Sequence, residues 1–483
     1  MSSKESSWSW IDSSRTRLTN MSDLIWGYAE LGLMEHRSSK VIADELEKHG
    51  FGVQRGVAGM PTAFTATWGS GRPVIGLMGE YDALPGISQK PVPFREPVVD
   101  GAPGHGCGHN IHGITAMAAA IAIKTAMAMS GDSGTIRFYG TPAEENYDGK
   151  VFMVRAGLFD DIDACLSHHP GQLNTARMGS SNAVFSVKFH FHGKSAHAGG
   201  SPEQGRSALD ALELMNTGVN YMREHVIDKS RIHYVTEAGG GQPNVVPDYS
   251  RSWYYVRAPE RDQLENIYEW ILRIAKGAEM MTGTTHQVEF IAGCSNLIPN
   301  KALGDLVLAN MREIVPPNYT SEELDFAKKI SQTVPLEQKR DSLRKSNMPR
   351  WERYEGIDLN QDVMAPWDEG QVMGGSTDVS DVSWKVPTME FGTTAFVLGS
   401  PGHSWQSVAC SGMSIGHKSL IFAAKTMAGA ALDLLRSPEL LIKAKEEHAN
   451  RVRGRLYRSP IPDDVPPPLD VARLAAESLT KRK

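Results

Sequence analysis

Predicted strands and helices alternate along the first third of the chain, and this alternation restricts the fold more than any other feature of the sequence. Short apolar runs with the length of buried strands occupy residues 73–79, 135–140 and 162–167. Helical spacing of apolar residues lies before, between and after them, at 22–32, 38–50, 111–129 and 150–156. Strands separated by helices are typical of a largely parallel sheet that helices cover on both faces. We therefore predict an α/β fold with such a sheet.

The pattern changes after residue 182, where the sequence predicts a second, smaller domain. Residues 184–192 alternate apolar and polar side chains, as in an antiparallel strand that is buried on one face. A helix, two strands and another helix are predicted to follow, at 205–224, 231–237, 252–257 and 264–282. This order is typical of an open-faced α+β sandwich, which we place at 182–297.

The remainder of the chain returns to the first pattern. A strand at 388–398 and a helix at 414–435 are predicted there, and the polar stretch 338–353 is predicted to be a surface insertion. We therefore expect residues 1–181 and 298–483 to form one discontinuous domain.

Composition and charge exclude several classes of protein. The 483 residues include 50 basic and 56 acidic side chains, with no basic cluster of the kind that binds nucleic acid. Four cysteines are too few and too dispersed for a disulfide framework. Residues 1–15 lack the apolar run of a secretory signal peptide, and the most apolar stretch, 111–129, is interrupted by His112 and Lys124. We expect a cytoplasmic protein with neither a nucleic-acid nor a membrane partner.

Side chains that commonly bind metal ions occur in four places, mostly directly after predicted strands. They are Cys107 with His109, Glu144 with Glu145, His168 with His169, and His403. Because binding sites form beyond the carboxyl ends of the strands in an open α/β sheet, we expect these side chains to converge. Glycines at 104, 106 and 108 allow close backbone approach. A thiolate, imidazoles and carboxylates together suffice for two metal ions that share a bridging ligand.

Each of these groups has an ordinary structural interpretation when it is taken alone. Adjacent glutamates are common on a solvated helical turn, and a Cys-x-His pair is usually incidental. His168 and His169 could be half-buried hydrogen-bonding residues. The metal-site prediction therefore depends on the coincidence of all four groups at one edge of the sheet.

Eight short motifs occur in a fixed order along the chain. They are 79–85 (GEYDALP), 104–110 (GHGCGHN), 142–145 (PAEE), 193–198 (GKSAHA), 244–247 (NVVP), 376–384 (STDVSDVSW), 403–406 (HSWQ) and 416–418 (GHK). The series resembles the M20 metallopeptidase and amidohydrolase family in its aminoacylase-like branch. Within that branch it is most similar to the group of B-type subunits of p-aminobenzoyl-glutamate hydrolase. The resemblance extends from about residue 10 to about residue 465.

The resemblance implies two divalent metal ions in each copy of the chain, of Mn, Zn, Co or Ni. Their ligands would be a bridging thiolate together with imidazoles and a carboxylate, namely Cys107, His109, Glu145, His169 and His403. His169 is preferred because its distance from the preceding strand matches the family's ligand position, and His168 is the alternative.

The same resemblance implies the catalytic residues. Glu144 would act as general base and then as general acid. Asp82 would orient a ligand imidazole, although an aspartate at a strand end can also simply cap the next turn. His197 would reach the active site from a partner subunit and polarise the scissile carbonyl.

Four residues are implied to hold a carboxylate of the substrate, namely Asn244, Arg257, Ser376 and Thr377. A guanidinium suits bidentate binding of a carboxylate, although Arg257 could instead form a surface ion pair. If His197 acts in trans, residues 182–297 form a lid and dimerisation domain. A homodimer is expected, and a hetero-oligomer with a related subunit stays open.

The implied activity is hydrolysis of the amide bond of an N-acyl or N-aroyl amino acid, such as p-aminobenzoyl-glutamate, by a metal-activated water. Two alternatives stay open, a metal-dependent deaminase acting on an aromatic amine and an inactive partner subunit. Asn110 replaces the Asp of much of the wider branch, and residues 146–148 (NYD) differ from the small residues of the B-type subunits. The B-type subunits resemble this chain at Asn110, whereas the loop at 146–148 borders the site and leaves the natural substrate open.

Residues 412–416 (GMSIG) also satisfy the G-x-S-x-G pattern of a serine hydrolase, with Asp433 and His448 in the order of an α/β-hydrolase. That interpretation requires a buried strand directly before the serine, and none is predicted. We therefore expect Ser414 to be the N-cap of a helix.

Overall fold

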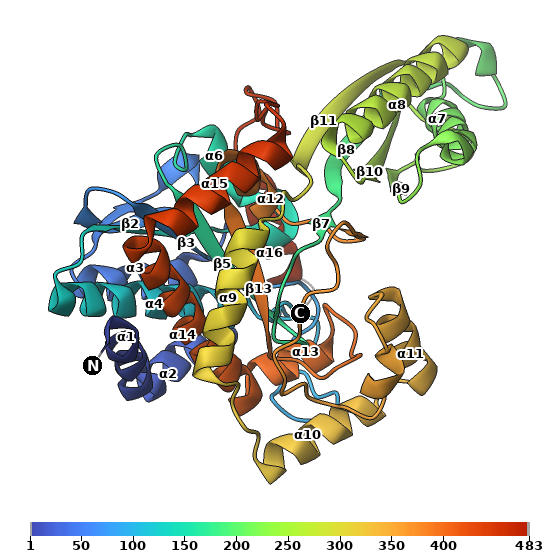
Figure 1. Ribbon diagram of the computed structural model, residues 1–483. Coiled ribbons are helices and arrows are strands. Elements are labelled where there is room, and N and C mark those ends of the chain that lie inside the picture. Colours follow the sequence, from blue (N-terminus) through green and yellow to red (C-terminus); the bar gives the residue numbers. More distant parts are fainter. Residues whose placement is uncertain (1, 481–483) are drawn as a thin grey trace.

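A seven-stranded sheet, parallel in its middle, forms the centre of the large domain (Figure 1). The computed structural model describes residues 2–480. The strand order is β1-β2-β4-β3-β5-β13-β6, with bounds β1 Gly52–Arg55, β2 Phe64–Ser70, β4 Gly134–Gly140, β3 Val74–Gly79, β5 Ala164–Gly171, β13 Thr388–Thr394 and β6 Thr175–Ala176. The strands β4, β3, β5 and β13 are parallel, whereas β1, β2 and β6 pair antiparallel at the edges. The predicted α/β fold is confirmed.

Side chains of the central strands alternate between two hydrophobic clusters. Ile75 and Leu77 of β3 face the cluster that contains α4 and α14, whereas Met78 faces the cluster that contains α6 and α12. The helices of the first cluster include α1 Ser3–Ser13, α2 Arg15–Tyr28, α3 His36–Lys48, α4 His109–Ser130, α9 Lys301–Ile314 and α14 Ser414–Arg436. Those of the second include α6 Gly149–Arg155 and α12 Val379–Lys385. Helices therefore cover both faces, as a buried parallel sheet requires.

Among residues 2–480, one helix is long and apolar enough to cross a membrane, and it is α4. Its most apolar window has a mean hydropathy of 1.4, and 83% of that window is buried inside the protein. The helix packs on β3, β4, β5 and α14. Its composition is therefore that of a core helix of the large domain.

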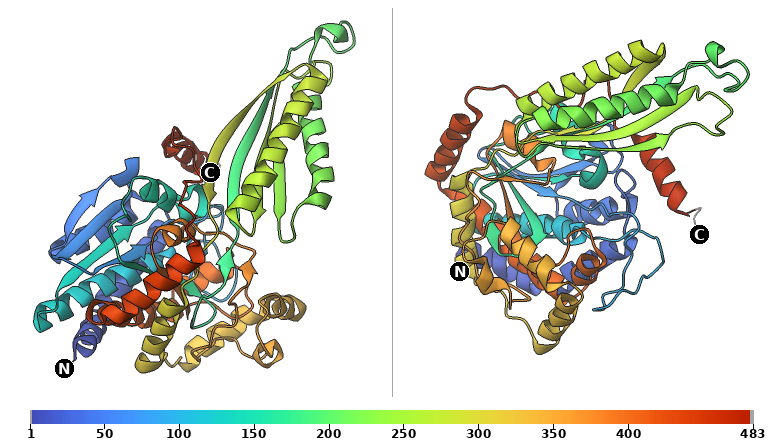
Figure 2. Two further views of the ribbon diagram at one scale, coloured as in Figure 1. Left: turned by 45° about the horizontal axis from the view of Figure 1, so that its top comes forward. Right: turned by 90° about the vertical axis from the view of Figure 1, so that its right-hand side faces the viewer.

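A four-stranded antiparallel sheet forms the projecting part of the molecule, which we call the arm (residues 183–294). Its order is β11-β8-β10-β9, with bounds β11 Thr285–Cys294, β8 Ala183–His192, β10 Tyr249–Ala258 and β9 Arg231–Ala238. The helices α7 (Ala208–Met222) and α8 (Arg261–Thr282) cover one face of this sheet, and Figure 2 shows both on the same side of the arm. The sequence did not predict β11, because its first half has no regular alternation of apolar and polar residues.

The alternation within β10 separates the two faces of the arm. Every second residue, such as Tyr254 and Val256, is buried against α7 and α8. The residues between them, such as Tyr255 and Arg257, are only partly buried and lie on the open face. The arm therefore has one open sheet face, which is available to line a binding site.

A short two-stranded sheet marks the place where the chain passes from the large domain into the arm. Strand β7 (Ser180–Ser181) pairs in parallel with β12 (Val372–Met373). The Asn182 N–H also donates to the carbonyl of Gly375 at 3.0 Å. The loop after β12 is thereby fixed beside the base of the arm.

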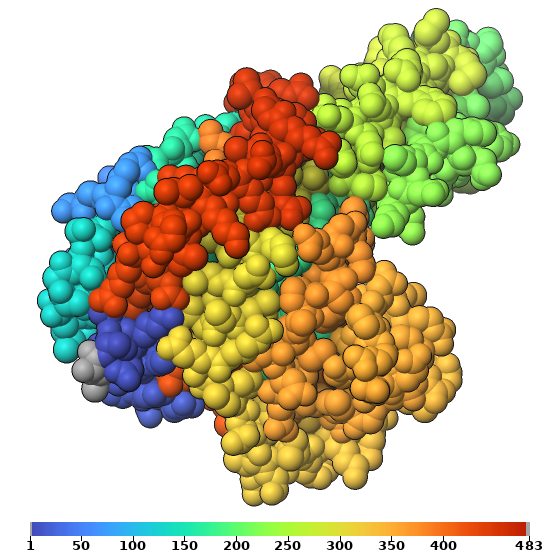
Figure 3. Space-filling model, viewed as in Figure 1, coloured from blue at the N-terminus to red at the C-terminus, as the bar shows by residue number. Residues whose placement is uncertain are grey.

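The other helices are α5 Glu144–Tyr147, α10 Ser321–Gln332, α11 Leu336–Lys345, α13 Trp405–Ser411, α15 Pro438–Val452 and α16 Leu469–Thr480. Short 3-10 turns occupy η1 Val57–Gly59, η2 Pro202–Gln204, η3 Arg223–His225 and η4 Trp351–Tyr354. Figure 3 shows the arm standing clear of the segment that contains α10 and α11, with the surface hollowed between them.

Candidate metal centre and active site

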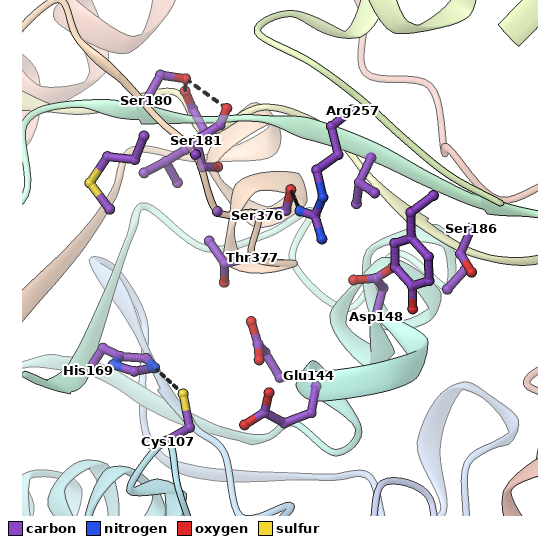
Figure 4. A pocket seen from close by; sticks show the side chains of 18 of the residues that line it. Cys107, Glu144, Asp148, His169, Ser180, Ser181, Ser186, Arg257, Ser376 and Thr377 are labelled. Atoms are coloured by element: carbon purple, nitrogen blue, oxygen red, sulfur yellow. Dashed lines mark hydrogen bonds between the residues drawn. The ribbon is translucent and has the colours of Figure 1, made fainter. Parts of the chain in front are cut away.

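A pocket of about 560 Å³ lies where the carboxyl ends of the central strands meet the base of the arm. Its lower wall comes from β5, from α5 and from the loop before α4. Its upper wall comes from the open face of the arm and from the loop after β12. Figure 4 shows Cys107, Glu144 and His169 on one side of this space and Arg257, Ser376 and Thr377 on the other.

Three side chains at the bottom of the pocket form a first candidate metal group. Cys107 precedes α4, His109 is the first residue of α4, and His169 lies on β5. One potential ligand atom from each lies within 4.8 Å of the other two, and Cys107 Sγ is 3.2 Å from His169 Nε2. Thiolate and imidazole ligands suit a transition-metal ion.

A second candidate group shares Cys107 with the first. It consists of Cys107, Glu145 and His403, whose potential ligand atoms also lie within 4.8 Å of one another. Glu145 Oε2 is 3.5 Å from His403 Nε2. Cys107 therefore stands between the two groups, as a side chain that bridges two cations would.

An unpartnered polar atom supports the fit of these residues to cations. Glu145 Oε1 is buried and has no hydrogen-bond partner among residues 2–480, whereas His109 Nε2 lies 3.1 Å from Glu80 Oε2. Leaving a buried carboxylate oxygen unpaired is costly, and a cation would pair with Glu145 Oε1. Burial raises the pKa of Glu145 to about 7 and raises the pKa of the Cys107 thiol above its usual range. Both groups therefore need a nearby positive charge to be stable as anions at neutral pH.

His169, and not His168, belongs to the first group. The Nδ1 atom of His169 lies 2.8 Å from the carbonyl oxygen of Pro170, so Nδ1 carries the proton and Nε2 keeps its lone pair. His168 is fully buried, and its Nε2 is 2.8 Å from Thr393 Oγ1. The first histidine of the pair therefore belongs to the core, and the second faces the pocket.

Asp82 positions one side chain of each group. Its Oδ1 is 2.9 Å from His109 Nδ1, and its Oδ2 accepts a hydrogen bond from the Glu145 N–H at 3.0 Å. The contact with His109 fixes the tautomer in which Nδ1 carries the proton and Nε2 keeps its lone pair. The alternative considered from the sequence, a simple cap of the next turn, does not explain the contact with His109.

Glu144 lies close to a buried charge network that the sequence analysis missed. Potential ligand atoms of Glu144, Glu80 and His109 lie within 4.8 Å of one another. Lys150 Nζ is 2.6 Å from Glu80 Oε1 and 2.7 Å from Asp378 Oδ1. Lys150, Glu80 and Asp378 are all buried. Burial raises the pKa of Glu144 well above its usual value, and Glu80 and Glu145 raise it further.

Part of this network had a signal in the sequence. Glu80 and Asp378 both lie within the ordered motifs, and Glu80 directly follows strand β3. Lys150 had none, because a lysine on a predicted helix is usually solvated. Only the three-dimensional structure identifies it as the buried partner of two carboxylates.

The predicted substrate-binding residues are divided between two places. Arg257 Nη1 donates to Ser376 Oγ at 2.7 Å, and both residues line the pocket with Thr377. Asn244 does not line it, because it lies beyond the far end of β10 in the exposed 240–248 segment. The expectation that Asn244 and Arg257 act at one site is therefore not met within one chain.

His197 lies beside Asn244 at the tip of the arm. The Ala198 N–H donates to the carbonyl of Asn244 at 2.9 Å, and His197 is exposed. His197 follows β8 and Asn244 precedes β10, so both lie at the ends of these strands that are remote from the pocket-lining residues Val184 and Arg257. Nδ1 of His197 accepts from the Gly200 N–H at 2.9 Å, so a neutral ring carries its proton on Nε2.

The serine-hydrolase alternative lacks its structural context. Ser414 is the first residue of α14, and the helix α13 precedes it where a buried strand is required. Asp433 pairs with Lys4 at 2.8 Å, and His448 Nε2 is 2.8 Å from the carbonyl of Ser383. The N-cap of α14 is Met413, so the expected capping role of Ser414 was wrong by one position.

Comparison with protein families gives a match over most of the chain. The family described as peptidase family M20/M25/M40 matches residues 76–431. The B-type subunit of the p-aminobenzoyl-glutamate hydrolase of Escherichia coli K12 is 41% identical over 471 residues, which cover 95% of this chain and 97% of that protein. The Xaa-Arg dipeptidase of Mus musculus is 28% identical and covers 90% of both chains.

Two further similarities concern related proteins. The A-type subunit of the same Escherichia coli K12 hydrolase is 30% identical over 56% of this chain and 73% of that protein. The crystal structure of an aminobenzoyl-glutamate utilization protein from Klebsiella pneumoniae superposes with a TM-score of 0.58 at 19% identity, covering 88% of this chain and 97% of that one. At that identity the structure supports the fold alone.

Proposed function

Because this chain belongs to peptidase family M20/M25/M40 and is therefore a hydrolase of that family, we propose that it cleaves the amide bond of p-aminobenzoyl-glutamate or of a closely related N-aroyl amino acid. The observation that carries the proposal is the position of Cys107 in both metal groups, at the bottom of a pocket that Glu144 and Arg257 also line. The 41% identity to one subunit of a p-aminobenzoyl-glutamate hydrolase supports the substrate class.

We assign one divalent cation to the group of Cys107, His109 and His169. A second divalent cation is assigned to the group of Cys107, Glu145 and His403. Such cations, when bound, supply Lewis acidity that activates a water and polarises an amide carbonyl. Mn, Zn, Co and Ni all suit a mixture of thiolate, imidazole and carboxylate ligands. The unpartnered Glu145 Oε1 supports this assignment.

Glu144 is the proposed proton carrier. Its carboxylate accepts a proton from the attacking water and then donates it to the nitrogen of the leaving amino acid. The raised pKa of Glu144 suits this role, since it makes the carboxylate a stronger acceptor for the proton of the water. Arg257 and Ser376 bind the carboxylate of the amino acid at the opposite wall of the pocket.

His197 is proposed to act on the pocket of a second copy. His197 lies beyond the far end of β8, whereas residues at the opposite end of this strand line its own pocket. A neutral ring carries its proton on Nε2, because Nδ1 accepts a hydrogen bond. In a homodimer through residues 182–297, Nε2–H would donate to the carbonyl oxygen of the scissile amide, and Asn244 would enter beside it. A hetero-oligomer with a related protein is the alternative, since two relatives named as different subunits of one hydrolase both match this chain.

We propose a cytoplasmic location as well. All four cysteines are free, and Cys107 must stay reduced to act as a ligand. Fractionation of the native host and immunodetection of the chain would test this location.

Purified chain loaded separately with each of the four metals tests the function. Release of glutamate and p-aminobenzoate from p-aminobenzoyl-glutamate supports the proposal. Release of ammonia without glutamate would instead establish the deaminase alternative. Complete inactivity of the chain alone, with activity after addition of a related protein of the same family, would identify an inactive partner subunit.

A further inference from the structure

Three arginines line the pocket, and they differ in how their charge is compensated. Arg177 forms an ion pair with Glu390, whose side chain is buried. Arg231 and Arg257 also line the pocket, yet no carboxylate among residues 2–480 lies within ion-pairing distance of either one. Two guanidinium groups in the pocket are therefore without an anionic partner.

The pairing of β9 with β10 places these two arginines side by side. Arg231 and Arg257 are directly opposite each other in the antiparallel register, so their side chains emerge from the same face of the sheet. Directly opposed side chains have Cβ atoms about 4.5–5.5 Å apart, and like charges in such a pair destabilise a sheet. An anionic ligand between them would remove this cost.

His233 adds a polar imidazole beside these two arginines on the same face of the arm. It pairs with Tyr255, lies two residues from Arg231 and lines the same pocket. Its face of the sheet is the open one, opposite to the face that α7 and α8 cover. Arg231, His233 and Arg257 thus form one cluster of two guanidinium groups and one imidazole at the upper wall of the pocket, which we call the arm cluster.

The arm cluster offers more donors than one carboxylate needs. Arg257 together with Ser376 suffices for the carboxylate next to the scissile amide. Arg231 is more exposed and lies on the neighbouring strand, so it reaches a group displaced sideways from that carboxylate. In an amino dicarboxylic acid of the glutamate type, three carbon atoms separate the two carboxylates, which is a comparable displacement.

We infer that Arg231 and His233 form a second carboxylate subsite, which restricts this enzyme to N-acyl derivatives of amino dicarboxylic acids. This inference rests on the proposed function, and it adds the residues that recognise the side chain of the leaving amino acid. The positive charge of the same cluster disfavours a substrate whose amino acid has a cationic side chain. The name of the similar Xaa-Arg dipeptidase indicates that this relative, in contrast, accepts an arginine.

Matched substrates test the inference directly. Metal-loaded wild type is assayed with p-aminobenzoyl-glutamate, with its isosteric amide p-aminobenzoyl-glutamine and with p-aminobenzoyl-lysine. We expect kcat/KM for the glutamate substrate to exceed that for the glutamine substrate by about tenfold to a hundredfold, since a charge-assisted hydrogen bond is lost. Arg231→Gln should reduce that ratio to near one, Arg231→Lys should restore part of it, and Arg231→Glu should favour the lysine substrate.

Arg273→Gln is the matched control. Arg273 lies exposed on α8, so the variant removes an equal charge from the arm without changing its open face. We expect its substrate preference to equal that of wild type. Binding of both substrates to Glu144→Gln and to Glu144→Gln with Arg231→Gln, measured by calorimetry, separates recognition from turnover.

The outcomes distinguish this inference from the proposed function. If wild type cleaves the glutamate and glutamine substrates equally well, or if Arg231→Gln leaves their ratio unchanged, the second subsite is overturned while the amidohydrolase activity stands. If wild type cleaves none of the substrates, whichever of the four metals it is loaded with, the proposed function itself fails.

Discussion

Asp82 Oδ1 lies 2.9 Å from His109 Nδ1, and through its second oxygen Asp82 also holds the backbone of Glu145. One buried carboxylate thereby orients a ligand of each metal group. Asp82→Asn keeps the size of the side chain but removes its charge. We expect its metal affinity to fall by about tenfold to a hundredfold, as for other residues that orient a ligand imidazole. Titration of metal-free protein by calorimetry gives this value, and unchanged affinity would contradict the positioning role.

Cys107 is the one side chain common to both metal groups. We expect Cys107→Ser to lose most of both ions, because a serine hydroxyl is not deprotonated at neutral pH and cannot replace the thiolate. Cys107→Asp should retain a larger share, since a carboxylate can also bridge two cations. Elemental analysis after dialysis measures the metal content. Cys410→Ser, which alters a buried thiol of the core outside these groups, should keep the full complement.

Glu144 is expected to matter for turnover and not for metal binding. Glu144→Gln removes the proton carrier but leaves both ligand groups of Cys107 intact. The value of kcat should fall by about a hundredfold to ten-thousandfold. Metal content near that of wild type must accompany the loss. An active variant would show that another group carries the proton.

His197 can be tested by complementation between two inactive variants. A dimer with one Glu144→Gln copy and one His197→Asn copy contains one complete site, because the His197→Asn pocket keeps Glu144 and receives His197 from its partner. Random assembly after coexpression should restore about a quarter of wild-type activity, although each variant alone is nearly inactive. Activity equal to the mean of the two pure variants would argue against action in trans.

Lys150 should contribute to stability through the two carboxylates that it contacts. Lys150→Met leaves Glu80 and Asp378 buried without their common cation, and breaking a buried charge pair typically costs about 3–5 kcal/mol of the free energy of unfolding. Denaturant titration followed by tryptophan fluorescence measures the change. Lys345→Met, on the last turn of the surface helix α11, is the control and should change stability little.

The elements that the sequence predicted well are those with strong local signals. The apolar run at 73–79 became β3 at Val74–Gly79, and the helical pattern at 264–282 became part of α8 at Arg261–Thr282. The edge strand β1 and its neighbour β2 were missed, because β1 is largely exposed and β2 is polar in its second half. The pairing of such strands depends on the neighbour that they meet in the sheet, which no local pattern encodes.

The candidate site divides in a similar way. The order of motifs along the chain selected Cys107, His109 and Glu145 as candidate ligands, and the structure brings Cys107 close to each of the other two, as sheet geometry predicts. The role of Lys150 was not accessible from the sequence, because nothing near it in the chain shows that it is buried. The separation of Asn244 from Arg257 was equally hidden, since it follows from the length and direction of β10.

The sequence by itself therefore determined the fold class and the chemical types at the ends of the strands, since both follow from the alternation of local patterns and from side-chain chemistry. Only the tertiary structure decided which histidine of the pair at 168–169 faces the pocket, which charges are buried together, and that the tip of the arm lies far from its own pocket. Those properties arise from contacts between segments that are distant in the chain. The energies of these contacts depend on how deeply the side chains are buried and on where they point, and both are defined only in the folded protein.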